Sequence, residues 1–193
     1  MGSKLNLVLG GTRSGKSAFA EELAKKWGER VTYIATAACL DQEMERRIAK
    51  HRAVRPAHWT TVEATHGVAQ VVKQVTADSQ VVLLDCLTLL VSNLLFQEEN
   101  LADQEIESRV LEEIRGLAVA AKNSPCPVII VSSEVGLGLV PENQLGRLYR
   151  DILGKANQIV AEEAAHVYLV IAGIPVELKA LSQQLKERID NEN

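Results

Sequence analysis

The chain has 193 residues, of which 47% are hydrophobic, and its formal net charge is −4 with an isoelectric point near 5.6. This length supports one well-filled core, and no linker-like stretch divides it, so we expect a single domain over residues 1–193. The acidic balance lacks the basic footprint of a general nucleic-acid binder, so we expect a small-molecule partner and no nucleic acid. Three cysteines without a C-x-x-C pair argue against a disulfide framework or zinc site and favour a reducing, cytoplasmic location. The longest apolar runs, at 87–96 and 167–176, are too short to span a membrane.

The first predicted element is a buried strand at 5–9, which leads into a glycine-rich loop and then a helix-forming segment. The loop matches the phosphate-binding pattern G-x-x-x-x-G-K-[ST] and consists of Gly10, Gly11, Thr12, Arg13, Ser14, Gly15, Lys16 and Ser17. Gly10 and Gly15 permit backbone angles that point N–H groups at phosphate oxygens. Lys16 would contact the β and γ phosphates, and the Ser17 hydroxyl would bind Mg²⁺. The chain is therefore predicted to bind a nucleoside triphosphate.

Four further short runs rich in β-branched residues alternate with segments of helical periodicity. They read as buried strands at 31–34, 81–84, 128–131 and 167–171. Alternation of this kind predicts an α/β fold, with a mostly parallel central sheet and helices on both faces. Ligands of such sheets collect at the carboxyl ends of the strands, so the chemistry is expected there.

Asp85 directly follows the strand at 81–84, where phosphate-loop proteins place an acid that orients Mg²⁺. We therefore predict Ser17 and Asp85 as the metal-binding residues. The alternative is that Asp85 caps a helix beginning near Leu87.

A polar segment, 132–134, follows the strand at 128–131, and the glycine-containing stretch 135–140 comes next. This pattern is typical of a loop that approaches a ligand or moves. The alternative is an ordinary strand-to-helix connection with Pro141 in the first turn of the next helix.

The segment 40–52 is predicted to be a helix capped by Asp41. Met44, Ile48 and His51 share one stripe of that helix, so His51 points where the apolar side chains point. From periodicity alone a packed histidine is favoured over a nucleophile. The catalytic alternative would place it among positive charges that face the triphosphate, namely Arg47, Lys50, Arg52 and Arg55.

Five ordered blocks then carry a resemblance to the bifunctional adenosylcobinamide kinase / adenosylcobinamide-phosphate guanylyltransferase family. These are GGTRSGKS at 10–17, YIATA at 33–37, DQEMERRIAKHRAVRPAHWTTVE at 41–63, LLDCLTLLVSNLL at 83–95 and SSEVGLGLVPENQLGRLYRDILGKANQ at 132–158. The match continues through VYLVIAGIPVELK at 167–179 and so runs nearly end to end. It implies a phosphate-loop NTPase fold of the RecA-like class. The chain departs from the resembling sequences at Lys50, where they often have a second histidine or another residue, and at Ser133, where they commonly have Asn.

The resemblance implies a two-step enzyme of cobalamin nucleotide-loop assembly. The first step phosphorylates the terminal hydroxyl of the aminopropanol arm of adenosylcobinamide with ATP or GTP. The second transfers GMP from GTP to adenosylcobinamide phosphate through a GMP–histidine intermediate, and it releases pyrophosphate and adenosylcobinamide-GDP. A single-activity kinase of a small metabolite, without covalent GMP, is the alternative.

The resemblance also assigns roles to residues of this chain. The nucleophilic histidine falls on His51, which with Lys16 would be catalytic. The nucleotide-binding positions fall on the loop and on Ala35, Thr36, Ala37, His51, Arg52, Ala53, Val54, Glu63 and Asp85. Glu63 would follow a weakly indicated strand at 59–62. The resemblance further implies a homo-oligomer, expected to be a trimer, and the aromatic candidates for a corrinoid pocket are Trp59, Tyr149 and Tyr33.

Overall fold

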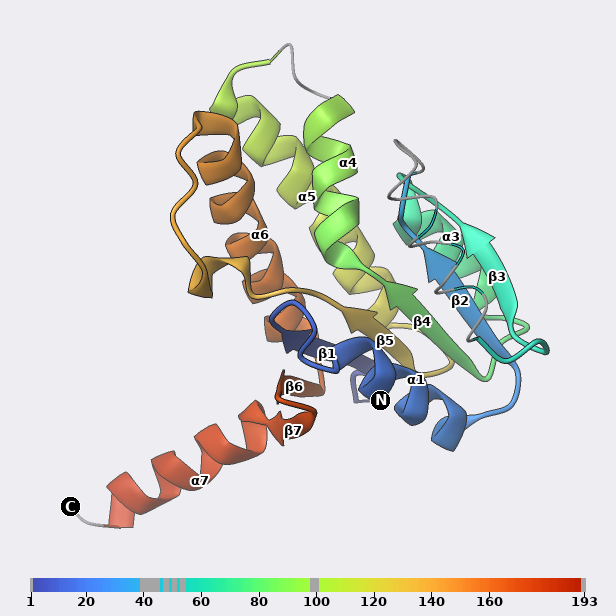
Figure 1. The fold of residues 1–193 in the computed structure, drawn as a ribbon. Helices are drawn as coiled ribbons and strands as arrows, with labels where there is room; N and C mark the ends of the chain where they lie inside the picture. Colours follow the sequence, from blue (N-terminus) through green and yellow to red (C-terminus); the bar gives the residue numbers. More distant parts are fainter. Residues whose placement is uncertain are drawn as a thin grey trace.

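A computed structural model describes residues 2–38, 46, 49, 52, 55–97 and 101–191 of the chain (Figure 1). Within these residues one sheet has seven strands. In chain order they are β1 (Leu5–Gly10), β2 (Val31–Ala35), β3 (Thr60–Glu63), β4 (Val81–Asp85), β5 (Val128–Val131), β6 (His166–Ile171) and β7 (Ile174–Glu177). All five strands that the apolar runs predicted are present, and the weakly indicated strand before Glu63 is β3.

The strand order across the sheet is β3-β2-β4-β5-β1-β6-β7. Every neighbouring pair is parallel except β6 and β7, which pair antiparallel. One strand, β5, separates β1, which carries the phosphate loop, from β4, which ends at Asp85. The predicted α/β fold with a mostly parallel central sheet is therefore confirmed.

Helices cover both faces of the sheet, as predicted (Figure 1). Their bounds are α1 (Lys16–Trp27), α3 (Val68–Val75), α4 (Leu87–Gln97), α5 (Asp103–Lys122), α6 (Gln144–Glu163) and α7 (Leu178–Asn191). Alternate residues of each strand point to opposite faces of the sheet, and each face is covered by its own set of helices. Val8, Tyr33 and Leu83 face α1 in the smaller cluster of buried side chains.

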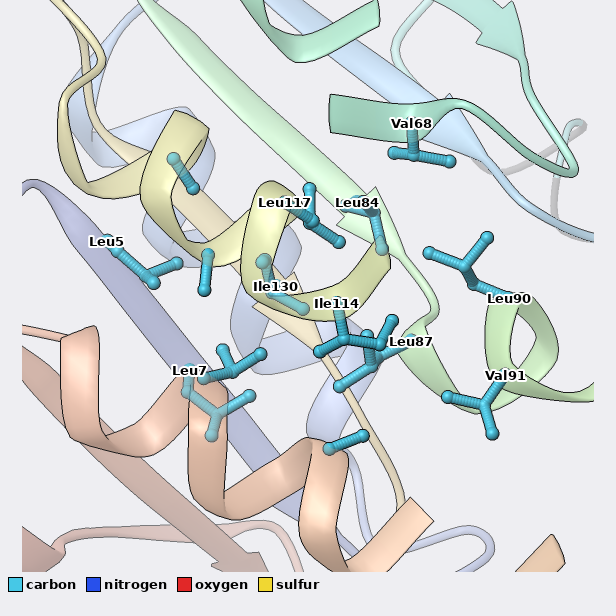
Figure 2. Packing of buried hydrophobic residues seen from close by; sticks show 14 of the residues in the cluster. Leu5, Leu7, Val68, Leu84, Leu87, Leu90, Val91, Ile114, Leu117 and Ile130 are labelled. Atoms are coloured by element: carbon cyan, nitrogen blue, oxygen red, sulfur yellow. The ribbon is translucent and has the colours of Figure 1, made fainter. Parts of the chain in front are cut away.

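The larger core lies between the other face of the sheet and helices α3, α4, α5 and α6. Figure 2 shows Leu5, Leu7, Leu84 and Ile130 of the strands packed against Ile114 and Leu117 of α5, with Leu87, Leu90 and Val91 of α4 and Val68 of α3 beside them. Burial of these aliphatic side chains is the main force holding the sheet rigid. The carboxyl ends of the strands thereby become a fixed platform for loops.

Two local predictions need correction. Pro141 is not in the first turn of a helix, because α6 begins at Gln144 and is capped by Asn143, whose side chain accepts a hydrogen bond from the Gly146 N–H at 2.6 Å. The stretch that seemed a single apolar run to residue 176 contains a hairpin, in which β7 turns back on β6.

The last helix, α7, extends away from the sheet (Figure 1). Among the helices that the structure describes, none is both long and apolar enough to cross a membrane.

Candidate nucleotide-binding site

The phosphate loop links β1 to α1, as the sequence predicted. Its backbone turns sharply at Arg13, where φ is 58°, and at Gly15, where φ is 96°. Within the loop the Ser14 N–H donates to the Gly11 carbonyl at 3.3 Å. Lys16 crosses the loop, and its Nζ donates to the same carbonyl at 3.2 Å. The lysine ammonium therefore lies over the concave side, where phosphate oxygens would bind.

Gly10 is required by space, and Gly15 by space and by its positive φ. A Cβ on Gly10 would lie 2.4 Å from Ser14 Oγ and 2.7 Å from the Val170 carbonyl oxygen. A Cβ on Gly15, whose φ is positive, would lie 3.2 Å from the Cα of Gly173 in the β6–β7 turn. The Gly173 N–H also donates to the Ser14 carbonyl at 2.8 Å. The hairpin that includes β7 thus supports the loop from outside.

Asp85 lies half-buried at the carboxyl end of β4, and its carboxylate is held by Tyr33 on the adjacent strand. The Tyr33 hydroxyl donates to Asp85 Oδ2 at 2.8 Å. The guanidinium of Arg55 stacks on the Tyr33 ring, with Cζ 3.5 Å from the centroid. Burial, and then the charge of Asp85, raise the pKa of Tyr33 well above its usual 10, so its hydroxyl remains a donor.

The carboxyl ends of β2 and β4 are tied together by Thr36, which is fully buried. Thr36 Oγ1 donates to the Cys86 carbonyl at 2.7 Å and accepts from the Cys86 N–H at 2.8 Å. Asn93 of α4 donates to the Thr36 carbonyl at 2.7 Å. Ala35 is buried and Ala37 half-buried on either side. The predicted segment 35–37 is therefore a strand end held in place by hydrogen bonds from the neighbouring strand and from α4.

Glu63 ends β3 and forms an ion pair with Arg52, and both side chains are more than half exposed. They line a cavity of about 450 Å³ together with Arg55, Pro56, Ala57, Trp59 and Thr61. The Nε and Nη1 atoms of Arg55 are buried without a hydrogen-bond partner among the described residues. The positive charge of Arg55 beside the cavity favours an anionic ligand there.

The sheet register sets three of the predicted residues side by side. Ala35 pairs with Asp85 on one side and with Glu63 on the other. Gly10 ends β1 at the same edge of the sheet. The structure therefore brings the phosphate loop, the segment 35–37, Asp85 and Glu63 to one edge, the carboxyl edge that the sequence predicted.

Other predicted residues are placed differently or not at all. His51, Ala53 and Val54 lie outside the described residues. Tyr33 is only 1% exposed, so its proposed place in a corrinoid pocket was wrong, and it serves Asp85 instead. A tyrosine on a buried strand needs a partner for its hydroxyl, and this is the signal that sequence reasoning missed.

The family model for cobinamide kinase / cobinamide phosphate guanyltransferase matches residues 6–178. The bifunctional adenosylcobalamin biosynthesis protein CobU of Escherichia coli is 43% identical over 179 residues, which cover 90% of this chain and 98% of that protein. The bifunctional adenosylcobalamin biosynthesis protein CobP of Pseudomonas aeruginosa is 42% identical over 174 residues, covering 90% of this chain and 96% of that protein.

Among solved structures, the crystal structure of the RadB recombinase matches 87% of this chain and 74% of its own, with 17% identity and a TM-score of 0.44. The family model and the curated relatives each cover most of the chain. The chain therefore belongs to the cobinamide kinase / cobinamide phosphate guanyltransferase family.

Proposed function

We propose that this chain carries out both reactions of its family, the phosphorylation of adenosylcobinamide and the transfer of GMP from GTP to adenosylcobinamide phosphate. The observation that carries the proposal is the alignment of the phosphate loop, Ala35, Asp85 and Glu63 along one sheet edge of a chain in this family. A simple kinase needs the loop and Asp85. The cavity between Arg52 and Glu63 extends the site beyond the phosphates and gives a second reaction somewhere to occur.

In the phosphorylation step, backbone N–H groups of the loop and Lys16 hold the β and γ phosphates of ATP or GTP. The acceptor hydroxyl attacks the γ phosphorus, and the bridging oxygen leaves with the nucleoside diphosphate. The shape of the loop is preset by Gly10, Gly15 and the hydrogen bond from Gly173. Little reorganisation is then needed when the triphosphate binds.

In the second step, His51 acts as the nucleophile. Its ring nitrogen attacks the α phosphorus of GTP, pyrophosphate leaves, and the acceptor phosphate then displaces the histidine from the bound GMP. Arg55 supports this step, because it lines the cavity and its guanidinium brings positive charge that attracts phosphate oxygens. Arg52 and Glu63 bind the remainder of the nucleotide, and Ala53 and Val54 are proposed as further nucleotide-binding positions from the family resemblance.

Mg²⁺ fits the residues at the loop. The Ser17 hydroxyl and the Asp85 carboxylate are hard oxygen ligands, and the Tyr33 hydrogen bond fixes the orientation of that carboxylate. When bound, the ion neutralises charge on the phosphates that leave. We place these reactions in the cytoplasm, in agreement with the free thiols of Cys86 and Cys126.

The deciding experiment is an intact-mass spectrum of the protein after incubation with Mg²⁺ and GTP. Wild type should gain one GMP that is lost in acid and kept in alkali, as expected of a phosphoramidate, and His51→Ala should gain none. Lys16→Ala should weaken both reactions, because each needs the triphosphate held, whereas His51→Ala should keep phosphorylation of cobinamide. A wild-type protein that binds GTP and phosphorylates cobinamide but never carries GMP would reduce the function to that of a kinase.

We also propose that the chain forms a homo-oligomer, expected to be a trimer, and that α7 takes part in it. Ile174 of β7 and Leu181 and Leu185 of α7 expose apolar side chains on the segment that extends from the body (Figure 1). Light scattering during size-exclusion chromatography should give the mass of three chains for wild type and a smaller mass for Leu185→Glu. Gln184→Glu, on an adjacent exposed position, is the matched control. A monomeric wild type would refute the assembly.

A further inference from the structure

Glu134 lies at the carboxyl end of β5, between the strand that carries the phosphate loop and the strand that ends at Asp85. Its backbone N–H donates to the Gly10 carbonyl at 3.3 Å, so the chain at Glu134 is joined to the first residue of the loop. No role for it follows from the nucleotide site described above. A carboxylate next to the phosphates would repel them, and its presence there calls for another explanation.

The side chain of Glu134 is held by a buried polar cluster. Asn157 of α6 donates through Nδ2 to Glu134 Oε1 at 3.2 Å and to the Ser133 carbonyl at 3.1 Å. Asn157 is itself positioned by Ser132, whose hydroxyl donates to Asn157 Oδ1 at 2.6 Å, and both residues are buried. One carboxylate oxygen is therefore fixed, while Oε2 has no hydrogen-bond partner among the described residues. An oriented carboxylate with one free oxygen can accept a proton.

The surroundings of Glu134 favour proton uptake. Partial burial of the carboxyl, opposed by the Asn157 hydrogen bond, raises its pKa above the usual value for glutamate. In the loop 135–140 that follows Glu134, Val135 packs against the core, whereas Leu137 and Leu139 face solvent with 81% and 96% exposure. Exposed apolar side chains next to a polar site suit a large, partly apolar substrate, and the corrin ring of cobinamide is one.

We propose that Glu134 is the general base of the phosphorylation step and that the loop 135–140 contacts the corrinoid; this rests on the proposed function. The hydroxyl of the acceptor gives its proton to Glu134 Oε2 as its oxygen bonds to the γ phosphorus. The bond from that phosphorus to the bridging oxygen breaks, and its electron pair leaves with the nucleoside diphosphate. The guanylylation cavity lies on β3, which two further strands separate from β5. Glu134 therefore serves the first reaction and not the formation of GMP–histidine.

The test compares Glu134→Gln with Glu142→Gln, an exposed glutamate after the same loop. Glutamine retains the oxygen that accepts from Asn157 but cannot take the proton. With cobinamide and Mg²⁺–ATP, Glu134→Gln should lower kcat by about 100-fold or more, the usual contribution of a general base. The covalent GMP formed from GTP without acceptor should be unchanged in both variants, and Glu142→Gln should match wild type throughout.

A second variant tests the acceptor surface. Leu139→Ser should raise the KM for cobinamide and leave the KM for ATP and the kcat unchanged. An unchanged kcat in folded Glu134→Gln would overturn the role of the base, as would an equal loss of GMP adduct and kinase activity. A wild type that phosphorylates no cobinamide would instead count against the proposed function, so the two failures are distinguishable.

Discussion

The hydroxyl of Tyr33 and the carboxylate of Asp85 are joined by a 2.8 Å hydrogen bond across two adjacent strands. Arg55 stacks on the face of the same phenol ring. The residue proposed to bind Mg²⁺ and a residue that lines the nucleotide cavity are thus connected through one buried side chain. Tyr33 is a positioning residue, because it acts on the nucleotide through Asp85 and Arg55.

Tyr33→Phe should therefore impair metal-dependent steps without unfolding the protein. Loss of a hydrogen bond to a charged group costs about 1.5–3 kcal/mol when it is fully felt, which corresponds to roughly 10-fold to 100-fold in kcat/KM. The concentration of Mg²⁺ needed for half-maximal phosphorylation should rise, because the carboxylate is no longer fixed. The control is Tyr168→Phe on β6. Equal Mg²⁺ dependence in wild type and Tyr33→Phe would show that the hydrogen bond does not position Asp85.

The same hydroxyl predicts a pH dependence of stability. The pKa of Tyr33 is raised in the folded protein, so its stabilising effect is complete below about pH 10, the value for an unfolded tyrosine, and is lost as pH rises further. At pH 8 Tyr33→Phe should be less stable than wild type by about 1.5–3 kcal/mol, the value of a hydrogen bond to a charged group. Above pH 10 this difference should shrink by up to about 1.4 kcal/mol per pH unit, since only wild type has the group that ionises on unfolding.

Urea unfolding between pH 8 and 11 measures this difference. Tyr149→Phe is a useful comparison, because burial also raises the pKa of Tyr149. Its removal should likewise reduce the loss of unfolding free energy as the pH rises above 10. If the free energy of unfolding changed with pH in parallel for wild type and Tyr33→Phe, the pKa of Tyr33 would be the same in the folded and the unfolded protein.

Much of the fold could be predicted because its strands are buried on both faces. Runs such as Val81 to Leu84 and Val128 to Val131 are continuously apolar, and alternation with helices specifies a parallel sheet. The hairpin of β6 and β7 was missed for a physical reason. Its turn uses Ala172 at φ 51° together with Gly173, and alanine is uncommon at positive φ. In addition, β7 is short and contains Pro175, which is tolerated at a sheet edge but is a poor strand signal.

The candidate site could be predicted in part. The loop at 10–17 is a local pattern, and Asp85 follows a clear strand, so both were found from the sequence. The contacts of Tyr33 with Asp85 and of Asn157 with Glu134 join residues 52 and 23 positions apart. They depend on which strands and helices are neighbours, and local periodicity carries no information about that order.

The loop glycines offer a matched pair of substitutions. Gly10→Ala would place a Cβ 2.4 Å from Ser14 Oγ and 2.7 Å from a backbone oxygen of β6, whereas Gly11→Ala has no atom within 4 Å of the new Cβ. Overpacking of this kind costs about 1–3 kcal/mol and would shift the loop. Gly10→Ala should therefore lower the melting temperature and weaken GTP binding by at least about 10-fold, whereas Gly11→Ala should leave the melting temperature unchanged and weaken GTP binding less. Isothermal titration with GTP would decide, and equal effects of the two substitutions would contradict the steric argument.

The cluster below Glu134 is expected to contribute to stability through Asn157. Asn157→Leu keeps the size of the side chain but removes the partner of the buried Ser132 hydroxyl and of the Ser133 carbonyl. Unpaired buried polar groups cost about 1–3 kcal/mol each, so the melting temperature should fall by roughly 4–8 °C for a loss near 2 kcal/mol in a chain of this length. The matched control is Gln158→Leu on the exposed side of α6, which should leave the melting temperature within about 2 °C of wild type because exposed substitutions rarely exceed about 0.5 kcal/mol.

The kinetic effect of Asn157→Leu should separate from its effect on stability. Below the melting temperature the variant should phosphorylate cobinamide more slowly, because the carboxylate of Glu134 is no longer oriented, while GMP adduct formation from GTP continues at the wild-type rate. If Asn157 only stabilised the fold, both activities would match wild type at any temperature where the variant is folded. A combined Glu134→Gln and Asn157→Leu variant should then be no slower in phosphorylation than Glu134→Gln alone. Asn157 affects the rate only by orienting the base, and glutamine at position 134 cannot take the proton.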